Sequence, residues 1–277
     1  MPLASQLLFP VDFSPASFAL IPAVAALARR LQCAVTLLHS VQSVEPLSKE
    51  KRGELEAKLA EFGSGDGFTG LEVRREIVPG APAASIVERA AALANPLIMM
   101  PTQGTSAFRQ LLIGSVTASV LHDADAPVWT SAHCADGGPL PQEYRSIVCA
   151  VDLGPRTVQV LAYAAAFAAA FGAELHVVHA VPGIDPRFES GAANRAHGFL
   201  VSSAKEDYPA LAAAAKVDRP LEIVEEVGLT AGITGAAVRH HADLLIIGRG
   251  VMQGVLGRLR TNAHDLIRQS PCPVLSV

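Results

Sequence analysis

Short apolar runs alternate with longer amphipathic segments along the first half of the chain. Continuous apolar runs predict buried strands, and apolar residues that recur every three or four positions predict helices. The predicted strands are Gln6–Val11, Ala34–Ser40, Leu71–Val78, Leu97–Met100 and Pro127–Thr130, and the predicted helices are Pro15–Leu31, Pro46–Phe62, Pro82–Ala94 and Ser115–Asp123. This alternation predicts an α/β fold, a parallel sheet with helices on both faces.

The second half of the chain repeats the pattern of the first. Ile147–Val151, followed by Asp152, matches Leu7–Val11, followed by Asp12. The same spacing separates His39-Ser40-Val41 from His179-Ala180-Val181, and Asp243–Ile247 and Cys272–Val274 echo Pro96–Met100 and Ala126–Val128. A tandem duplication of one five-stranded unit explains these matches.

A polar segment rich in Gly and Pro, Ser131–Tyr144, separates the copies and is typical of a linker. We therefore expect two domains, residues 1–135 and 143–277. Two similar units predict packing about a pseudo-twofold axis, an intrachain pseudo-dimer. The apolar last strands, Pro127–Thr130 and Pro273–Val277, are the expected junction. Further association into a homodimer is left open.

Composition narrows the function classes. The 277 residues are 50% hydrophobic and 17% charged, with a net charge of −4, which favours neither nucleic acid nor a membrane surface as a partner. We expect a cytoplasmic protein, because there is no signal peptide pattern and no apolar run long enough to span a membrane. The four cysteines stand far apart and are interpreted as small buried side chains, and no metal-ligand spacing occurs.

The loop after the fourth predicted strand has features that bind phosphate. The strand runs into Pro101, Gly104 follows, and after nine further residues Gly114-Ser115 precedes a helix. Glycines let the backbone approach a ligand, and a helix start offers unpaired N–H groups and a positive dipole end. The second copy of this loop is altered, because it reads Gly248-Arg249-Gly250 and, after nine residues, Arg260-Thr261.

These residues make the chain resemble the universal stress protein family in its tandem two-domain form. The resemblance rests on Val-Asp after the first strand, His-x-Val in the second, and a G-x2-G-x9-G-S/T loop after the fourth. It implies two open five-stranded parallel sheets with strand order 3-2-1-4-5 and a ligand crevice between strands 1 and 4. Many members of that family bind ATP there.

The resemblance implies an adenine nucleotide in the first unit, most simply ATP, with or without Mg²⁺. Asp12 and Val41 would line its base and ribose, and Met100 and Pro101 its ribose and phosphates. The whole implied site is Pro10, Asp12, Val41, Met100, Pro101, Gly104, Gly114, Ser115 and Val116. A degenerate second site would comprise Asp152, Val181, Gly248, Gly250, Arg260 and Thr261.

Both loops depart from the family pattern. Pro101 stands where the first glycine belongs, and proline has no N–H to offer a phosphate. Such a loss costs roughly 1.5–3 kcal/mol, the scale of a charge-assisted bond. In the second loop, Arg260 replaces the last glycine, and either fills the phosphate space or supplies a charge to it. Arg249, Arg258 and Arg260 are either solvated charges or binders of phosphate or of an acidic partner.

Several of these residues also have a purely structural interpretation. Asp12 and Asp152 either line a ligand or assist the start of the following helix. His39 and His179 lie in apolar strands without a nucleophile motif, so hydrogen-bonded structural roles are expected. No catalytic residues and no metal site are expected.

The leading hypothesis is therefore a stress-response protein that binds ATP and acts on protein partners of unknown identity. The alternatives are an interaction or dimerisation module without nucleotide, and a slow ATP hydrolase.

Overall fold

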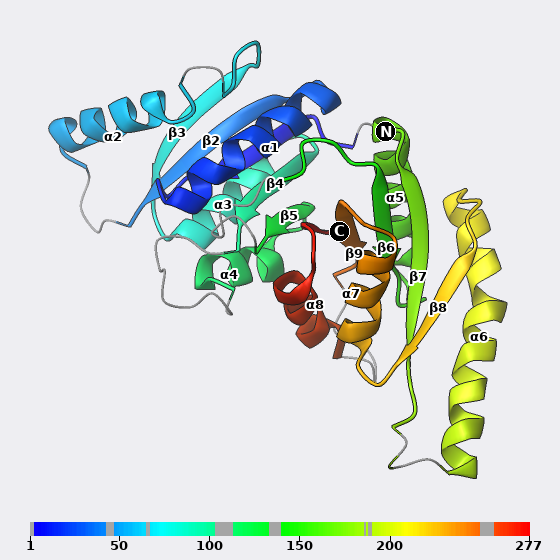
Figure 1. The fold of residues 1–277 in the computed structure, drawn as a ribbon. Coiled ribbons are helices and arrows are strands. Elements are labelled where there is room, and N and C mark those ends of the chain that lie inside the picture. Colours follow the sequence, from blue (N-terminus) through cyan, green and yellow to red (C-terminus); the bar gives the residue numbers. More distant parts are fainter. Residues whose placement is uncertain are drawn as a thin grey trace. The chain divides into compact units, whose positions relative to one another are not determined.

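The chain divides into two compact units, Met1–Glu143 and Tyr144–Val277 (Figure 1). The computed structural model describes residues 3–42, 47–64, 67–102, 113–132, 140–185, 187, 190–249 and 258–277. The division falls at the end of the segment that was predicted as a linker. Among the described residues, none of the helices is both long and apolar enough to cross a membrane.

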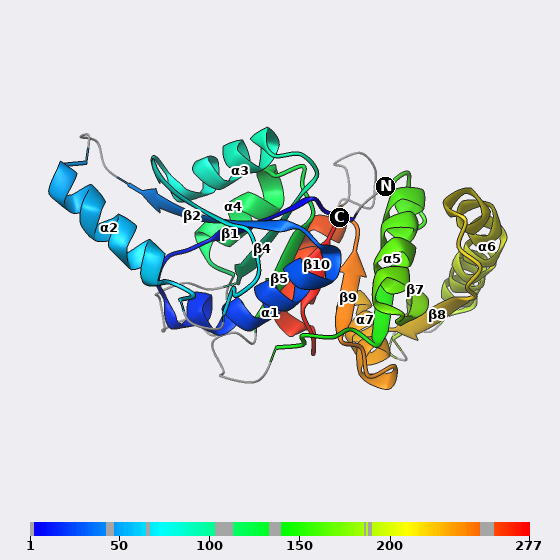
Figure 2. The ribbon, with the colours of Figure 1, turned by 90° about the horizontal axis from the view of Figure 1, so that it is seen from above.

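The first unit alternates strands and helices as predicted. Its strands are β1 (Gln6–Pro10), β2 (Ala34–Val41), β3 (Val73–Pro79), β4 (Pro96–Pro101) and β5 (Val128–Ser131), and its helices are α1 (Pro15–Leu31), α2 (Lys49–Glu61), α3 (Pro82–Ala92) and α4 (Ser115–Asp123). The strands form a parallel sheet in the order β3-β2-β1-β4-β5. In Figure 2, α3 and α4 cover one face of this sheet, and α1 and α2 lie on the other.

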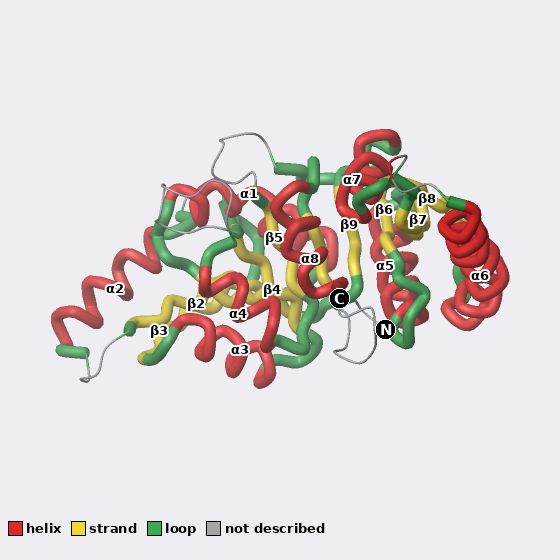
Figure 3. Tube along the Cα trace, turned by 90° about the horizontal axis from the view of Figure 1, so that it is seen from below, coloured by secondary structure: helices red, strands yellow, loops and turns green. Residues whose placement is uncertain are grey.

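The second unit repeats this topology. Its strands are β6 (Ser146–Ala150), β7 (Glu174–Pro182), β8 (Leu221–Glu226), β9 (Leu244–Ile247) and β10 (Val274–Ser276), and its helices are α5 (Thr157–Phe171), α6 (Gly191–Ala215), α7 (Leu229–Arg239) and α8 (Arg258–Gln269). The strand order is β8-β7-β6-β9-β10, again parallel. Helix α5 packs against α6, and α7 against α8; Figure 3 shows the two pairs on opposite sides of the strands. The expected order 3-2-1-4-5 is confirmed in each unit.

The central strands are buried on both faces, which explains their continuous apolar sequences. Leu7, Leu8 and Phe9 of β1 are fully inaccessible to solvent, and so are Ile147 and Val148 of β6. These strands lie in the middle of their sheets. The sites at their carboxyl ends therefore rest on rigid structure.

Helix starts follow the predicted capping. The Ser14 hydroxyl accepts a hydrogen bond from Ser17 N at 3.2 Å, and Pro15 occupies the first helical position of α1. Helix α2 begins at Lys49 and not at Pro46 as predicted, because Ser48 caps it by accepting from Lys51 N. Helix α3 ends at Ala92, two residues before the predicted end. The strand boundaries differ from prediction by a few residues at most.

Candidate functional site

The residues predicted to bind a ligand in the first unit lie along the carboxyl edge of its sheet. Pro10 ends β1, Val41 ends β2, and Met100 and Pro101 end β4. Strands β1 and β4 are neighbours although β2 and β3 intervene in sequence, so the strand order reverses between them. A reversal of this kind leaves a crevice beyond the carboxyl ends of the strands, where α/β sheets bind ligands.

Asp12 follows β1 and faces the start of α1. Its Oδ1 accepts hydrogen bonds from Ser14 N at 2.9 Å and from the Ser17 hydroxyl at 2.7 Å. The carboxylate thus stabilises the positive end of α1, as in the structural interpretation. Because Asp12 is exposed, this role leaves its second oxygen available to a ligand.

The second unit repeats this arrangement with different residues. Asp152 Oδ1 accepts from Gly154 N at 2.9 Å and from the Thr157 hydroxyl at 3.3 Å. The residue after each aspartate has a left-handed backbone, with φ of 58° at Phe13 and 56° at Leu153. Such a conformation is uncommon for a residue with a side chain and is found at ligand sites and tight turns. Sequence reasoning missed these features, although comparing the two copies a few residues further would have aligned Ser17 with Thr157.

The two strand histidines have the structural role that was expected. His39 Nδ1 donates to the Val11 carbonyl at 2.7 Å, and His179 Nδ1 donates to the Val151 carbonyl at 2.8 Å. Each ring therefore ties the end of one strand to the chain just before the aspartate. The Phe13 ring packs against His39, with centroids 4.6 Å apart. The histidines therefore hold the backbone of the site in place.

The two ends of the first unit's glycine loop are held together. Gly114 N donates to the Thr102 carbonyl at 2.7 Å, and the Thr117 hydroxyl donates to the Pro101 carbonyl at 3.0 Å. Gly114 is the N-cap of α4 and has no side chain with which to block the helix start. Ser115 and Val116 form the first turn of α4, so these three predicted residues lie at a helix N-terminus beside the end of β4. Gly104 lies outside the described residues.

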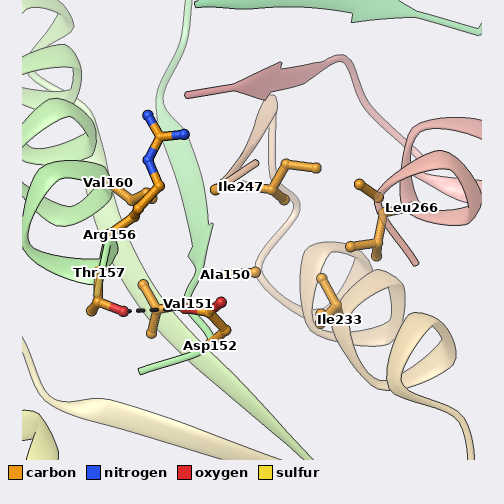
Figure 4. A pocket seen from close by; sticks show the side chains of 11 residues that line it. Ala150, Val151, Asp152, Arg156, Thr157, Val160, Ile233, Ile247 and Leu266 are labelled. Carbon is orange, nitrogen blue, oxygen red and sulfur yellow. Dashed lines mark hydrogen bonds between the residues drawn. The ribbon is translucent and has the colours of Figure 1, made fainter. Parts of the chain in front are cut away.

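In the second unit, a small pocket lies at the matching crevice between β6 and β9 (Figure 4). Its volume of about 30 Å³ is close to that of one water molecule. Two of the predicted residues, Asp152 and Gly248, line it, together with Ala150, Val151, Arg156, Thr157, Val160, Ile233, Ile247, Ala263 and Leu266. Apolar side chains thus form most of the wall, and Asp152 and Arg156 are its charged groups.

Of the remaining predicted residues of the second site, only Val181 has a described side chain, and it does not line the pocket. Val181 belongs to β7. Arg260 and Thr261 belong to α8, but their side chains are not among the described ones, and Gly250 lies outside the described residues.

At three positions a smaller side chain lines this pocket than stands at the matched position of the first unit. The sheet register aligns the copies, because Leu8 pairs with Ile98 and Val148 with Leu245. A Cβ added at Gly248 would lie 3.0 Å from Val160 Cγ2, closer than carbon atoms usually pack, so a side chain here would push Val160 aside. The matched pairs are Pro10 and Ala150, Leu20 and Val160, and Pro101 and Gly248.

Three cysteine thiols are buried in the protein and are best explained as packed core side chains. Burial raises the pKa of the Cys149 thiol to about 12 and that of Cys33 and Cys272 to about 11, so these thiols stay protonated. Cys134 lies outside the described residues. Among the residues that the structure describes, no cluster of His, Cys, Asp and Glu could hold a metal ion.

The family model described as "Universal stress protein family" matches this chain twice, over residues 5–131 and 143–277. The chain belongs to the universal stress protein family. Two matches in tandem also confirm the duplication inferred from the repeated strand ends. A comparison with curated proteins found no match.

Solved structures agree with this fold for a tandem universal stress protein. A universal stress protein from Archaeoglobus fulgidus superposes with a TM-score of 0.69 at 20% identity, covering 99% of this chain and 96% of its own. A functionally unknown protein from Pseudomonas aeruginosa gives 0.67 at 18% identity, covering 99% and 92%. A shorter Archaeoglobus fulgidus universal stress protein, solved in complex with dAMP, matches 48% of this chain and 97% of its own, at 23% identity and a TM-score of 0.37.

Proposed function

We propose that this universal stress protein binds an adenine nucleotide, ATP, in the crevice of its first unit. The observation that carries this proposal is the joining of Thr102 and Gly114 by a 2.7 Å hydrogen bond directly before α4. That bond holds an uncapped helix start beside the end of β4, and β4 pairs with β1, the strand that Asp12 follows. A helix start of this kind attracts phosphate, and the exposed carboxylate can accept hydrogen bonds from ribose hydroxyls.

We propose further that the protein acts through binding and not through catalysis, in the cytoplasm. The histidines at the crevice, His39 and His179, donate from Nδ1 to backbone carbonyls, which supports a structural role for them. Any Mg²⁺ would enter with the nucleotide. Occupancy can alter partner contacts only if ATP binds one conformation better than another.

Isothermal titration with ATP tests the proposal, and the tandem repeat supplies a matched control. Asp12→Asn should weaken ATP binding by about tenfold, the scale of one hydrogen bond to a charged group. Asp152→Asn makes the same change in the second unit and should leave ATP affinity within about twofold. The absence of heat and of any shift in melting temperature at millimolar ATP would refute nucleotide binding, because a ligand of the folded state must stabilise it.

The interaction module without nucleotide is favoured by Pro101, which is buried and has no N–H for a phosphate. A flat titration with ATP would favour that alternative. The hydrolase alternative predicts release of phosphate, so ATP recovered intact after long incubation would count against it.

A further inference from the structure

Helix α6 of the second unit is much longer than the helix at the same place in the first unit. Helix α6 has 25 residues, whereas α2, which follows the second strand of the first unit in the same way, has 13. Burial along α6 begins only at Ala204 and continues, at helical spacing, at Tyr208, Ala212 and Ala215. The repeat therefore shows that the fold does not need the first half of α6, residues 191–203.

The first half of α6 is nevertheless held in a fixed position. His197 Nδ1 donates to the Pro182 carbonyl at 3.0 Å, and its Nε2 donates to Glu225 Oε2 at 2.7 Å. A carbonyl and a carboxylate only accept, so both ring nitrogens carry a proton, and these bonds, chiefly the one to Glu225, raise the pKa of His197. The Ser190 hydroxyl caps the helix by accepting from Ala193 N at 3.1 Å. Because His197 meets the ends of β7 and β8, the turns before it extend past these strands, as Figure 1 shows.

A stripe of exposed side chains runs along the face of α6 that is turned away from its own sheet. Phe199 lies near its centre and is 70% exposed, which is unfavourable for a large apolar side chain unless another surface covers it. The stripe residues stand alternately three and four positions apart, which is the spacing of a coiled-coil seam, and they lie about half a turn around the helix axis from buried residues such as Tyr208. This α6 seam comprises Ala192, Arg195, Phe199, Ser202, Glu206, Pro209 and Ala213, all of them exposed.

The α6 seam carries one charge of each sign, and the two charges are placed symmetrically. Arg195 stands four residues before Phe199, and Glu206 stands four residues after Ser202. Among the described residues, neither Arg195 nor Glu206 has an ion-pair partner. A twofold axis midway between Phe199 and Ser202 therefore exchanges Arg195 with Glu206.

Two antiparallel copies of α6 complement each other about that axis. Arg195 of each copy faces the partner's Glu206, and Phe199 of each copy faces the partner's Ser202. Two parallel copies would instead bring Arg195 against Arg195 and Glu206 against Glu206, and contacts between like charges disfavour that arrangement. The charges thus select a second, antiparallel copy of the same helix, which is an interface with twofold symmetry.

Small residues beside the α6 seam leave room for the Phe199 rings. Ala196 and Ser203 flank Phe199 on one side of the helix, and Gly198 lies on the other. A Cβ added at Gly198 would meet nothing within 4 Å, so no contact within the described chain requires this glycine, which destabilises a helix relative to alanine. The close approach of a second helix explains it.

We propose that two copies of this chain associate through antiparallel pairing of their α6 seams. Phe199 is the central apolar anchor, and the pairs between Arg195 and Glu206 on either side of it set the direction and the register. A helix of 25 residues is about 37 Å long, so the contact extends over several turns. This inference does not depend on nucleotide binding by either unit.

Sedimentation equilibrium of the full chain without nucleotide tests the proposal, and should show a monomer–dimer equilibrium. Phe199→Asp should weaken the dimer at least about tenfold, because it replaces the apolar anchor by a charge. Val238→Asp is the matched control. Val238 is an apolar residue of α7, 59% exposed and outside the α6 seam, and its replacement should change the dissociation constant less than about twofold.

Reversal of the two charges gives a sharper test of direction and register. Arg195→Glu and Glu206→Arg should each weaken self-association at least about tenfold, because each brings like charges together in both pairs. An equimolar mixture of these two variants should dimerise about as tightly as wild type, since every Glu then faces an Arg of the partner. Such rescue would also show that both variants are folded.

The proposal is overturned if the wild-type chain stays monomeric up to about 1 mM, or if Phe199→Asp dimerises as tightly as wild type does. It is also overturned if the mixture of the two charge variants associates no more tightly than either variant alone. Circular dichroism shows whether Phe199→Asp folds, and the mixture decides if it does not. Titration with ATP concerns the first unit, and its outcome leaves these results unchanged.

Discussion

Gly248→Ala tests whether close packing at the end of β9 shapes the second unit's crevice. The added Cβ would lie 3.0 Å from Val160 Cγ2, whereas carbon atoms pack best at about 3.5–4.0 Å. Val160 is 3% exposed and cannot swing into solvent. Overpacking of this kind costs about 1–3 kcal/mol of unfolding free energy.

When Val160 is also replaced, the effect of Gly248→Ala on the free energy of unfolding should change sign. Val160→Ala removes the clashing methyl, and Gly248 is not among the residues with a left-handed backbone. In that background Gly248→Ala should stabilise the second unit by about 0.4–1 kcal/mol, because alanine restricts the unfolded chain more than glycine does. The coupling between the two substitutions is therefore about 1.5–4 kcal/mol, the sum of the two effects.

The aromatic residues allow the two units to be followed separately in urea unfolding. The single tryptophan, Trp129, lies in the first unit, and all three tyrosines (Tyr144, Tyr163 and Tyr208) lie in the second. Gly248→Ala should move the tyrosine transition and leave the Trp129 transition in place. An equal cost of Gly248→Ala in both backgrounds would refute the packing argument, and so would an equal shift of both transitions.

Three further predictions concern charge, ligand affinity and the core. Burial lowers the pKa of His176 below its usual value near 6.5, and the positive charge of His240, whose ring stacks on His176, lowers it further. The unfolded chain then binds more protons than the folded one, so the second unit should lose stability as the pH falls below about 6.5, and His176→Gln should reduce that loss in tyrosine-monitored urea unfolding. Pro101→Gly should tighten ATP binding by about ten- to a hundredfold if the restored N–H meets a phosphate, and calorimetry showing unchanged affinity would contradict this use of the N–H. Phe167→Ala should destabilise the second unit by about 3–5 kcal/mol in the same unfolding assay, because the ring is fully buried and packs 5.3 Å from Tyr144; a loss below 1 kcal/mol would contradict it.

Much of the candidate site follows from local patterns in the chain. Asp12 and Asp152 stand after buried strands, and parallel topology brings such strand ends to one edge of a sheet. The capping of α1 by Ser14 and the interpretation of His39 as structural also depend on neighbouring residues alone. These predictions succeeded because strand period and helix caps act over a few residues.

Other parts of the site depend on contacts between residues that are distant in sequence. Nothing in the sequence near Arg156 indicates that its guanidinium reaches the Arg249 carbonyl, since the chain between them forms α5 to β9. Nor does the glycine pattern reveal that Gly248 packs against Val160. The two left-handed residues, Phe13 and Leu153, are also hidden, because neither is a glycine that would indicate such a turn.

The sequence by itself determined the duplicated α/β fold, since the apolar runs, the helix caps and the repeated strand ends each act locally and agree with one another. Only the tertiary structure decided how the two crevices differ. A pocket's size depends on side chains that meet from β6, α5, α7, β9 and α8. The small residues Ala150 and Gly248 leave such a space only where they pack beside Val160. The Arg156 side chain lines that space only because the fold places α5 beside the end of β9.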